Sequence, residues 1–294
     1  MEKIIKNLAN MKVWVDFSLS PPSEFKTKAE SMRFVTEVMN RCLYLLKVGA
    51  ASAPDAETAK TGYTKSKAII VGYMAQLAKL YEGALIHICG SQPELTRIFF
   101  RPILEVAINM KHLIQSGGQV SPSVGAASCP SELEMFRVLE SKAKERALTP
   151  IEHRINELIL LQLEKDGISR AEWVYNDQEN IDKKNALQSC ENSCYNGSLY
   201  LYLFQKETDW IHRGWHDLRS YHLTQTGDYY VPDLCFDEPQ PRLGCQLTQV
   251  CLETLTIYLR WNQSDPDNEL TSIIRKLLKL NAVLDDAHEN TLGE

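Results

Sequence analysis

Helical periodicity decides the fold of this chain, and residues 93–114 carry the pattern in the stretch PELTRIFFRPILEVAINMKHLI. Apolar side chains recur there at spacings of three and four, which places them on one face of an α-helix. These side chains are Leu95, Ile98, Phe99, Ile103, Val106, Met110, Leu113 and Ile114. Pro102 lies inside the pattern, where proline removes a backbone donor and clashes with the preceding turn. We therefore predict a helix with a kink at Pro102.

The same spacing recurs along most of the chain. It predicts helices after an N-cap at Ser23, over 64–89, 131–147, 150–167, 197–206, 208–222 and 243–261, and from Asp265–Pro266 to about Ala287. The alternation typical of strands does not persist beyond a few residues. The sequence therefore predicts an all-α fold, a single multi-helix bundle with a kinked central helix.

Local composition suggests where the chain is divided. Residues 116–130 are rich in glycine, serine and proline, and residues 168–196 are polar without a sustained period, so both indicate loops. An aromatic and proline-rich stretch interrupts the helices at 229–241. We predict an N-terminal lead segment over 1–22, a helical bundle domain over 23–262, and a C-terminal helix with an acidic tail over 263–294.

Composition and charge exclude several classes of protein. A hydrophobic fraction of 44% is too high for an intrinsically disordered chain. The net charge of −6 argues against a general nucleic-acid coat protein, although a local basic groove is compatible with it. No signal peptide and no transmembrane window stand out, and the eight cysteines are scattered as in reduced proteins. We therefore expect a cytoplasmic protein.

The densest chemistry lies in residues 209–222, DWIHRGWHDLRSYH, which hold three of the seven histidines. On a helix, Asp209, His212 and His216 lie one turn apart on one side. The segment has the histidine spacing of a zinc protease but lacks its glutamate, so that class is excluded.

Three interpretations of this segment are open. It is a buried polar seam between helices, or a general acid–base site, or a metal site built from Asp209, His212 and His216. In the acid–base interpretation, Arg213 or Arg219 holds a phosphate.

A second polar row lies within the kinked helix. Arg101, Glu105 and Asn109 follow one another at i, i+4, with His112 beside them. Such a row usually forms an ion pair at the surface. The alternative is that it points into a cleft shared with the histidine-rich segment. We predict that the helix over 93–115 packs against the helix that carries His212.

Two of these segments resemble a known family. The Arg101-x-x-x-Glu105 helix and the later Asp209–His212 segment resemble a bacterial all-helical family of unknown function. That family is similar in style to the HEPN (higher eukaryote and prokaryote nucleotide-binding) domains of antiviral defence and toxin systems. The ribonuclease signature of HEPN domains has its one match at Arg146–His153, with Ala147 where the signature has a polar residue.

The resemblance implies a cytosolic effector of an antiphage or toxin-type system, a nuclease or hydrolase that acts on RNA or a nucleotide. The expected catalytic residues are Arg101, Glu105, His212 and His216. The expected substrate-binding residues are Asn109, Arg213, Arg219 and His222. No cofactor is predicted, and a divalent metal at the Asp209 row is the alternative.

The alternative function is a non-catalytic helical regulator or partner-binding subunit, similar to an antitoxin or a sensor. In that case the aromatic residues over 210–230 form an interface, because aromatic side chains are enriched in interfaces. The expected partners are a second copy of the chain or a protein of the same defence system, with RNA or a nucleotide as ligand and no membrane.

Overall fold

The computed structural model describes residues 25–117, 130–165, 219, 222–227, 229–236 and 240–292. Within these residues the chain forms eight helices and one two-stranded sheet, which confirms the predicted all-α fold. The chain divides into two compact units, residues 1–118 with 196–294, and residues 119–195. The predicted lead segment and the predicted helix over 197–206 lie outside the described residues.

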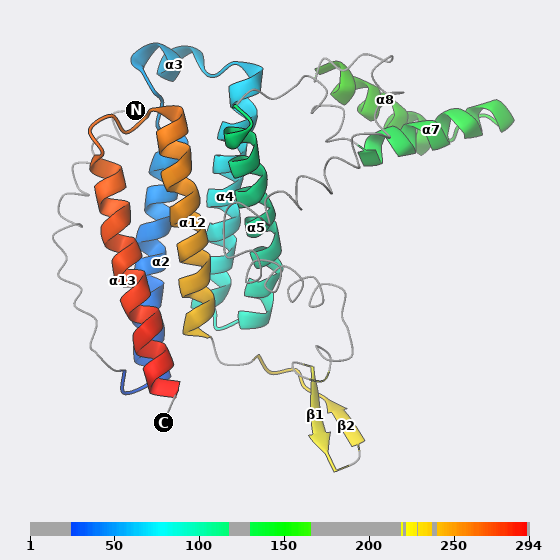
Figure 1. The fold of residues 1–294 in the computed structure, drawn as a ribbon. Coiled ribbons are helices and arrows are strands. Elements are labelled where there is room, and N and C mark those ends of the chain that lie inside the picture. Colours follow the sequence, from blue (N-terminus) through cyan, green and yellow to red (C-terminus); the bar gives the residue numbers. More distant parts are fainter. Residues whose placement is uncertain are drawn as a thin grey trace. The chain divides into compact units, whose positions relative to one another are not determined.

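Five long helices form a bundle in the first unit (Figure 1). They are α2 (Lys28–Ala51), α4 (Lys65–Cys89), α5 (Pro93–Gln115), α12 (Pro241–Asn262) and α13 (Glu269–Leu292), with a short α3 (Ala56–Thr61) between α2 and α4. Helix α12 packs against each of the other four long helices. Helix α13, which the sequence placed in a separate C-terminal segment, packs against α2 and α12 within this bundle.

Close packing around α12 depends on glycine as well as on large side chains. The fully buried side chains include Tyr81 of α4, Phe100 of α5 and Tyr258 of α12. At Gly244 of α12, an added Cβ would lie 2.5 Å from Val35 Cγ1 of α2. The two helices therefore approach closely at this point because glycine has no side chain.

The core also contains paired polar groups. The hydroxyls of Tyr81 on α4 and Thr248 on α12 lie 2.7 Å apart, and Asn281 Nδ2 of α13 donates to the Cys245 carbonyl oxygen of α12 at 3.0 Å. Burial raises the pKa of the Cys42 thiol to about 12, so this thiol is protonated at neutral pH. The five described cysteines form no disulfide with one another.

Helix α2 begins later than the sequence predicts. Thr27 is its N-cap, and Thr27 Oγ1 accepts the Glu30 N–H at 3.2 Å while the Glu30 carboxylate accepts the Lys26 N–H at 3.1 Å. The prediction of Ser23 as N-cap was wrong, because Thr27 and Glu30 have the spacing of a capping box and Ser23 has no glutamate at that distance. Pro102 lies inside α5 as predicted, and a kink there stays a prediction.

The expectation that no segment could span a membrane was wrong for helix α4. Its segment Ser66–Cys89 is long and apolar enough to span a membrane by length and composition alone, which the sequence analysis had excluded. Apolar residues of this helix, among them Leu77, Tyr81 and Leu85, are buried against neighbouring helices of the bundle. Packing within the bundle accounts for the composition of that side of the helix.

The second unit contains a helical hairpin of α7 (Pro130–Glu145) and α8 (Pro150–Lys165), which the predicted single bundle did not separate. Among the described residues of this unit, Phe136, Leu139 and Ile159 are buried apolar residues. The predicted capping box is present, since the Glu152 carboxylate accepts the Thr149 N–H at 2.9 Å and Thr149 Oγ1 accepts the Glu152 N–H at 3.4 Å.

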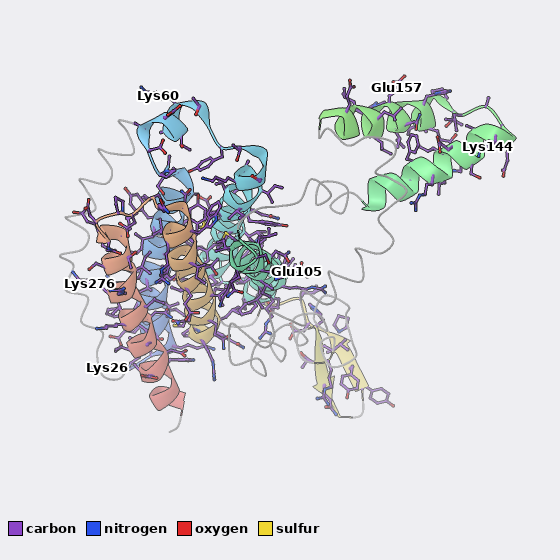
Figure 2. All side chains as sticks on the ribbon, turned by 45° about the horizontal axis from the view of Figure 1, so that its top comes forward. Lys26, Lys60, Glu105, Lys144, Glu157 and Lys276 are labelled. Atoms are coloured by element: carbon purple, nitrogen blue, oxygen red, sulfur yellow. The ribbon has the colours of Figure 1, made fainter. Side chains whose placement is uncertain are left out.

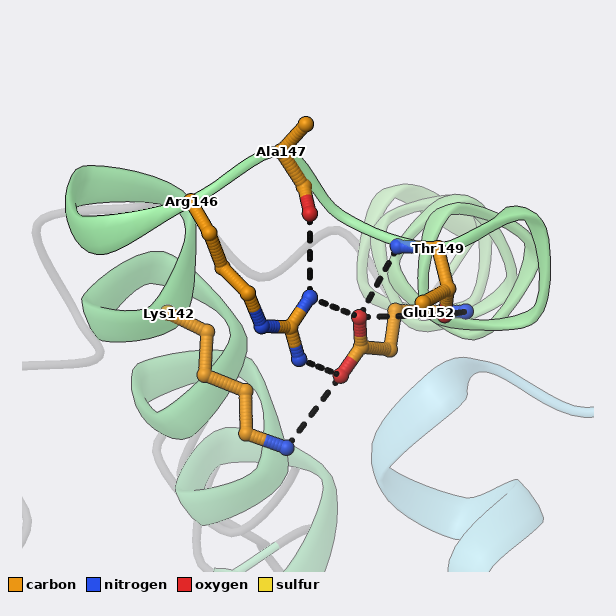
Figure 3. Close-up of polar contacts among 5 residues, drawn as sticks. All are labelled: Lys142, Arg146, Ala147, Thr149 and Glu152. Atoms are coloured by element: carbon orange, nitrogen blue, oxygen red, sulfur yellow. Dashed lines mark hydrogen bonds and ion pairs between the residues drawn. The ribbon is translucent and has the colours of Figure 1, made fainter.

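Glu152 also joins the two helices of this hairpin (Figure 3). Its two carboxylate oxygens accept hydrogen bonds from Arg146 Nη1 at 2.8 Å and Arg146 Nη2 at 2.7 Å, and Lys142 Nζ lies 3.2 Å from Oε1. Such a bidentate pair fixes both distance and orientation. The connection between α7 and α8 is therefore held by one carboxylate.

Candidate functional site

The predicted polar row on α5 forms the ion pair that its spacing favours. Arg101 Nε donates to Glu105 Oε1 at 2.8 Å, and both side chains are partly exposed (Figure 2 labels Glu105). Asn109, one turn further, is exposed. An exposed pair at i, i+4 adds little to stability. The row therefore leaves one partly exposed guanidinium beside a carboxylate on the outer side of α5.

The other half of the predicted site lies outside the described residues. This holds for Asp209, His212, Arg213 and His216, so the predicted packing of α5 against the helix of His212 stays a prediction. Among the described residues, no group of three or more histidine, cysteine, aspartate and glutamate side chains could hold a metal ion.

The remaining two predicted residues lie close to a hairpin that was not predicted. Arg219 is helical and exposed, and His222 lies in an exposed turn whose carbonyl oxygen accepts the Asp233 N–H at 2.8 Å. His222 is a turn residue directly before β1, so a helix does not extend to this residue as predicted. Residues 208–218, 220 and 221 of the predicted 208–222 helix lie outside the described residues.

Sequence reasoning missed the buried charges near the start of α5. Glu94 and Arg97 are buried, and Arg97 Nη2 donates to Gln240 Oε1, the N-cap residue of α12, at 3.5 Å. Their spacing of three residues, continued by Arg101, could have indicated a longer charged row on α5. The Arg97 side chain therefore joins α5 to the start of α12.

The hairpin consists of β1 (Leu223–Thr226) and β2 (Tyr229–Pro232), paired antiparallel (Figure 1). Gly227, which follows β1, has a φ of 62°, a conformation that glycine adopts without strain. The sequence analysis missed the strands because four residues are too few to show a period of two. A glycine followed by aspartate between such segments is a turn signal that could have found them.

The pattern of hydrogen bonds determines which backbone groups face outward. The bond from Asp233 N–H to the His222 oxygen makes those two residues a hydrogen-bonded pair. Because such pairs alternate along an antiparallel ladder, Tyr230 and Pro232 direct their backbone groups to the outer edge of β2. Proline has no N–H, so it weakens the pairing of another strand at this edge.

Asp233 fixes the chain where it leaves β2. Its carboxylate accepts the Cys235 N–H at 3.0 Å and the Thr224 hydroxyl at 3.0 Å. These two hydrogen bonds, first that of Cys235, hold the pKa of Asp233 below its usual value. The Asp233 side chain therefore stabilises the turn at 233–235 and also connects this turn to β1.

Strand β2 and the turn that follows it display large apolar side chains. Leu234 is 93% exposed and Tyr229 is 79% exposed. Val231 and Phe236 are also exposed, so we define the aromatic hairpin surface as Tyr229, Val231, Leu234 and Phe236. Tyr230 is exposed as well, but the alternation of side chains along β2 places it with Gln225 of β1 on the opposite face of the hairpin. Adjacent exposed apolar groups mark interaction sites, and aromatic side chains are enriched in the centres of protein interfaces. The arrangement can bind an apolar surface, and the Tyr229 hydroxyl can donate to an acceptor at the edge of that surface.

No protein-family model, no curated protein and no solved structure matches this chain. The resemblance to HEPN-like defence domains therefore stays a prediction.

Proposed function

We propose that this chain is a partner-binding protein that docks onto another protein through the aromatic hairpin surface. The observation that carries the proposal is the exposure of Tyr229 and Leu234 on a segment that Asp233 holds in one conformation. A fixed apolar projection loses little conformational entropy on binding, which favours affinity.

The chemistry of the hairpin indicates what kind of partner fits it. Pro232 weakens the addition of a strand at the outer edge of β2, so side chains rather than backbone groups provide the main contacts. The partner should offer an apolar depression for Leu234 and Phe236, with a hydrogen-bond acceptor at its rim for Tyr229.

Leu234 should carry a large share of the affinity. Burying a fully exposed leucine side chain contributes about 1.5–3 kcal/mol. Its loss should therefore weaken binding by roughly ten- to hundredfold. Truncation of the nearby exposed Gln225 on β1 should have a far smaller effect.

The experiment places a photo-crosslinking amino acid at position 234 and, as control, at position 225, in the cells that produce the protein. We expect one cross-linked species of defined mass at position 234 that is absent at position 225. With the partner identified, Leu234→Ala should raise the dissociation constant, and Gln225→Ala should leave it unchanged within about twofold. Equal cross-linking at both positions, or none at 234, would rule out the proposal.

The effector enzyme predicted from the sequence is a second candidate. It is supported by the partial exposure of the Arg101–Glu105 pair, which leaves the guanidinium within reach of a phosphate. In that candidate Glu105 orients Arg101, and His212 or His216 acts as general base and acid.

A further inference from the structure

The β1–β2 hairpin has two outer edges, which differ in how well they can accept another strand (Figure 1). At the edge of β2 the outward backbone groups belong to Tyr230 and Pro232, and the proline protects this edge because it has no N–H. On β1 the same alternation of hydrogen-bonded pairs directs the backbone groups of Leu223 and Gln225 outward. The edge of β1 therefore offers an N–H and a carbonyl oxygen at each of two residues.

Within the described residues, these backbone groups of β1 have no hydrogen-bond partner on the outer side. The Gln225 side chain donates to the Gly227 carbonyl oxygen at 3.1 Å, and Thr224, Gln225 and Thr226 are all exposed. The strand, Leu-Thr-Gln-Thr, contains neither proline nor a charged residue, with which proteins usually protect an edge. An unprotected edge of this kind pairs with an extended backbone.

The pattern of β1 is complementary to that of a second β1. In antiparallel pairing, an outward-facing residue must lie opposite an outward-facing residue of the other strand. The register centred on Thr224 satisfies this condition twice, because Leu223 of each copy lies opposite Gln225 of the other copy. The two copies of Thr224 then lie opposite one another, which is a favourable cross-strand pair. No like charges meet, since β1 has no charged residue.

We infer that this chain dimerises by antiparallel pairing of β1 with β1 of a second copy, in this register. The two hairpins then form one sheet with the strand order β2–β1–β1–β2. The contact is isologous, so it closes as a dimer. A strand without charged residues offers no electrostatic preference for a different partner, whereas a second copy matches it in both hydrogen-bonded pairs.

The inference goes beyond the proposed partner binding and does not depend on it. The two-fold axis of this pairing is perpendicular to the sheet, so it keeps each face of the hairpin on the same side. Tyr229 and Val231 of both copies therefore lie on one face, and the β1 edges that pair are not part of the aromatic hairpin surface. Because only a short strand pairs, the contact is small and the dimer should dissociate on dilution.

The first experiment measures the mass of the full chain by sedimentation over a wide range of concentration. We expect wild type to approach twice the chain mass at high concentration. Gln225→Pro removes an outward N–H of β1 without removing a β1–β2 hydrogen bond, so it should keep the mass of one chain. The matched control is Tyr230→Pro, because Tyr230 lies opposite Gln225 and directs its N–H to the edge of β2. This control should dimerise as wild type does.

Disulfide trapping tests the register and introduces no proline. Residues opposite one another in a non-hydrogen-bonded pair have Cα atoms about 4.5 Å apart, so Thr224→Cys should form a disulfide between two copies when oxidised glutathione is added. In the same register the two copies of residue 226 are offset by roughly 14 Å along the strands, which is too far for a disulfide. Thr226→Cys, exposed on the same face, is therefore the matched control. Wild type, measured alongside, shows how much cross-linking the native thiols produce.

Several results would overturn the inference. One is a wild-type chain that keeps the mass of one chain at every concentration, and another is a dimer that Gln225→Pro leaves intact. Equal disulfide formation by Thr224→Cys and Thr226→Cys would contradict the register. If both proline variants stay monomeric, proline has disturbed the hairpin itself, and the trapping pair decides. Cross-linking to a different protein from position 234 is a separate result, so either proposal can fail without the other.

Discussion

Glu152 shows how much a single residue can organise. Its carboxylate accepts hydrogen bonds from Arg146 and from the Thr149 backbone, and these hold its pKa well below the usual value for glutamate. A carboxyl whose pKa is lower in the folded state stabilises that state at all pH values above its unfolded pKa of about 4.3. As the pH falls below that value toward the folded pKa, the contribution is lost.

We therefore expect Glu152→Gln to lower the melting temperature of the α7–α8 unit at neutral pH. The difference from wild type should shrink as the pH falls below about 4, where the wild-type carboxyl begins to lose the advantage of its charge. Amide hydrogen exchange in the first turn of α8 measures the effect locally. Glu157→Gln, an exposed glutamate on the same helix, is the control and should change little. A difference that grows with acidity would contradict the assigned role.

His212 carries the catalytic hypothesis at the residue scale. If the chain is an effector enzyme, His212→Ala should abolish toxicity or RNA cleavage and change the unfolding free energy by less than about 1 kcal/mol. Cell growth, RNA integrity and thermal melting are the measurements. A folded variant with the full wild-type effect would exclude this role, and a strongly destabilised one would indicate a buried structural histidine. A metal role would require bound metal in wild type that the variant loses.

At the scale of elements, the approach of α2 to α12 depends on Gly244. We expect Gly244→Ala to destabilise the bundle by about 1–3 kcal/mol, because the added methyl group would overlap Val35 and Met39. Urea unfolding of the full chain measures this. Gly72→Ala on α4 is the matched control, since nothing lies within 4 Å of its Cβ position. That control should stabilise the helix by about 0.5–1 kcal/mol, and equal effects of the two substitutions would contradict the packing argument.

Elements also differ in how well local sequence predicts them. The long helices were found because a period near 3.6 repeats many times in 22 to 25 residues. The capping box of α8 was found because both partners lie within four residues. The N-cap of α2 was predicted at Ser23, but the structure has it at Thr27. Both residue types cap helices and the two lie only four positions apart, so the local sequence did not distinguish them. The hairpin was missed because its strands are four residues long.

At the scale of the whole molecule, the two compact units differ in how much apolar surface they bury. Helix α12 of the bundle has buried side chains on most of its circumference. In the part of the α7–α8 unit that the structure describes, the buried apolar residues are Phe136, Leu139 and Ile159. The bundle therefore has an extensive core, whereas the α7–α8 connection depends strongly on the polar contacts of Glu152.

The sequence by itself determined the all-α class, most helix positions and the Arg101–Glu105 pair, because these depend on neighbours within a few residues along the chain. The tertiary structure decided which polar and apolar groups are buried. Glu94 and Arg97 are charged yet buried, and Leu234 is apolar yet exposed. Periodicity describes one helix or strand at a time, whereas burial depends on which distant segments cover it. The candidate binding surfaces are departures from the usual pattern of burial, and they therefore became visible only once the packed elements were known.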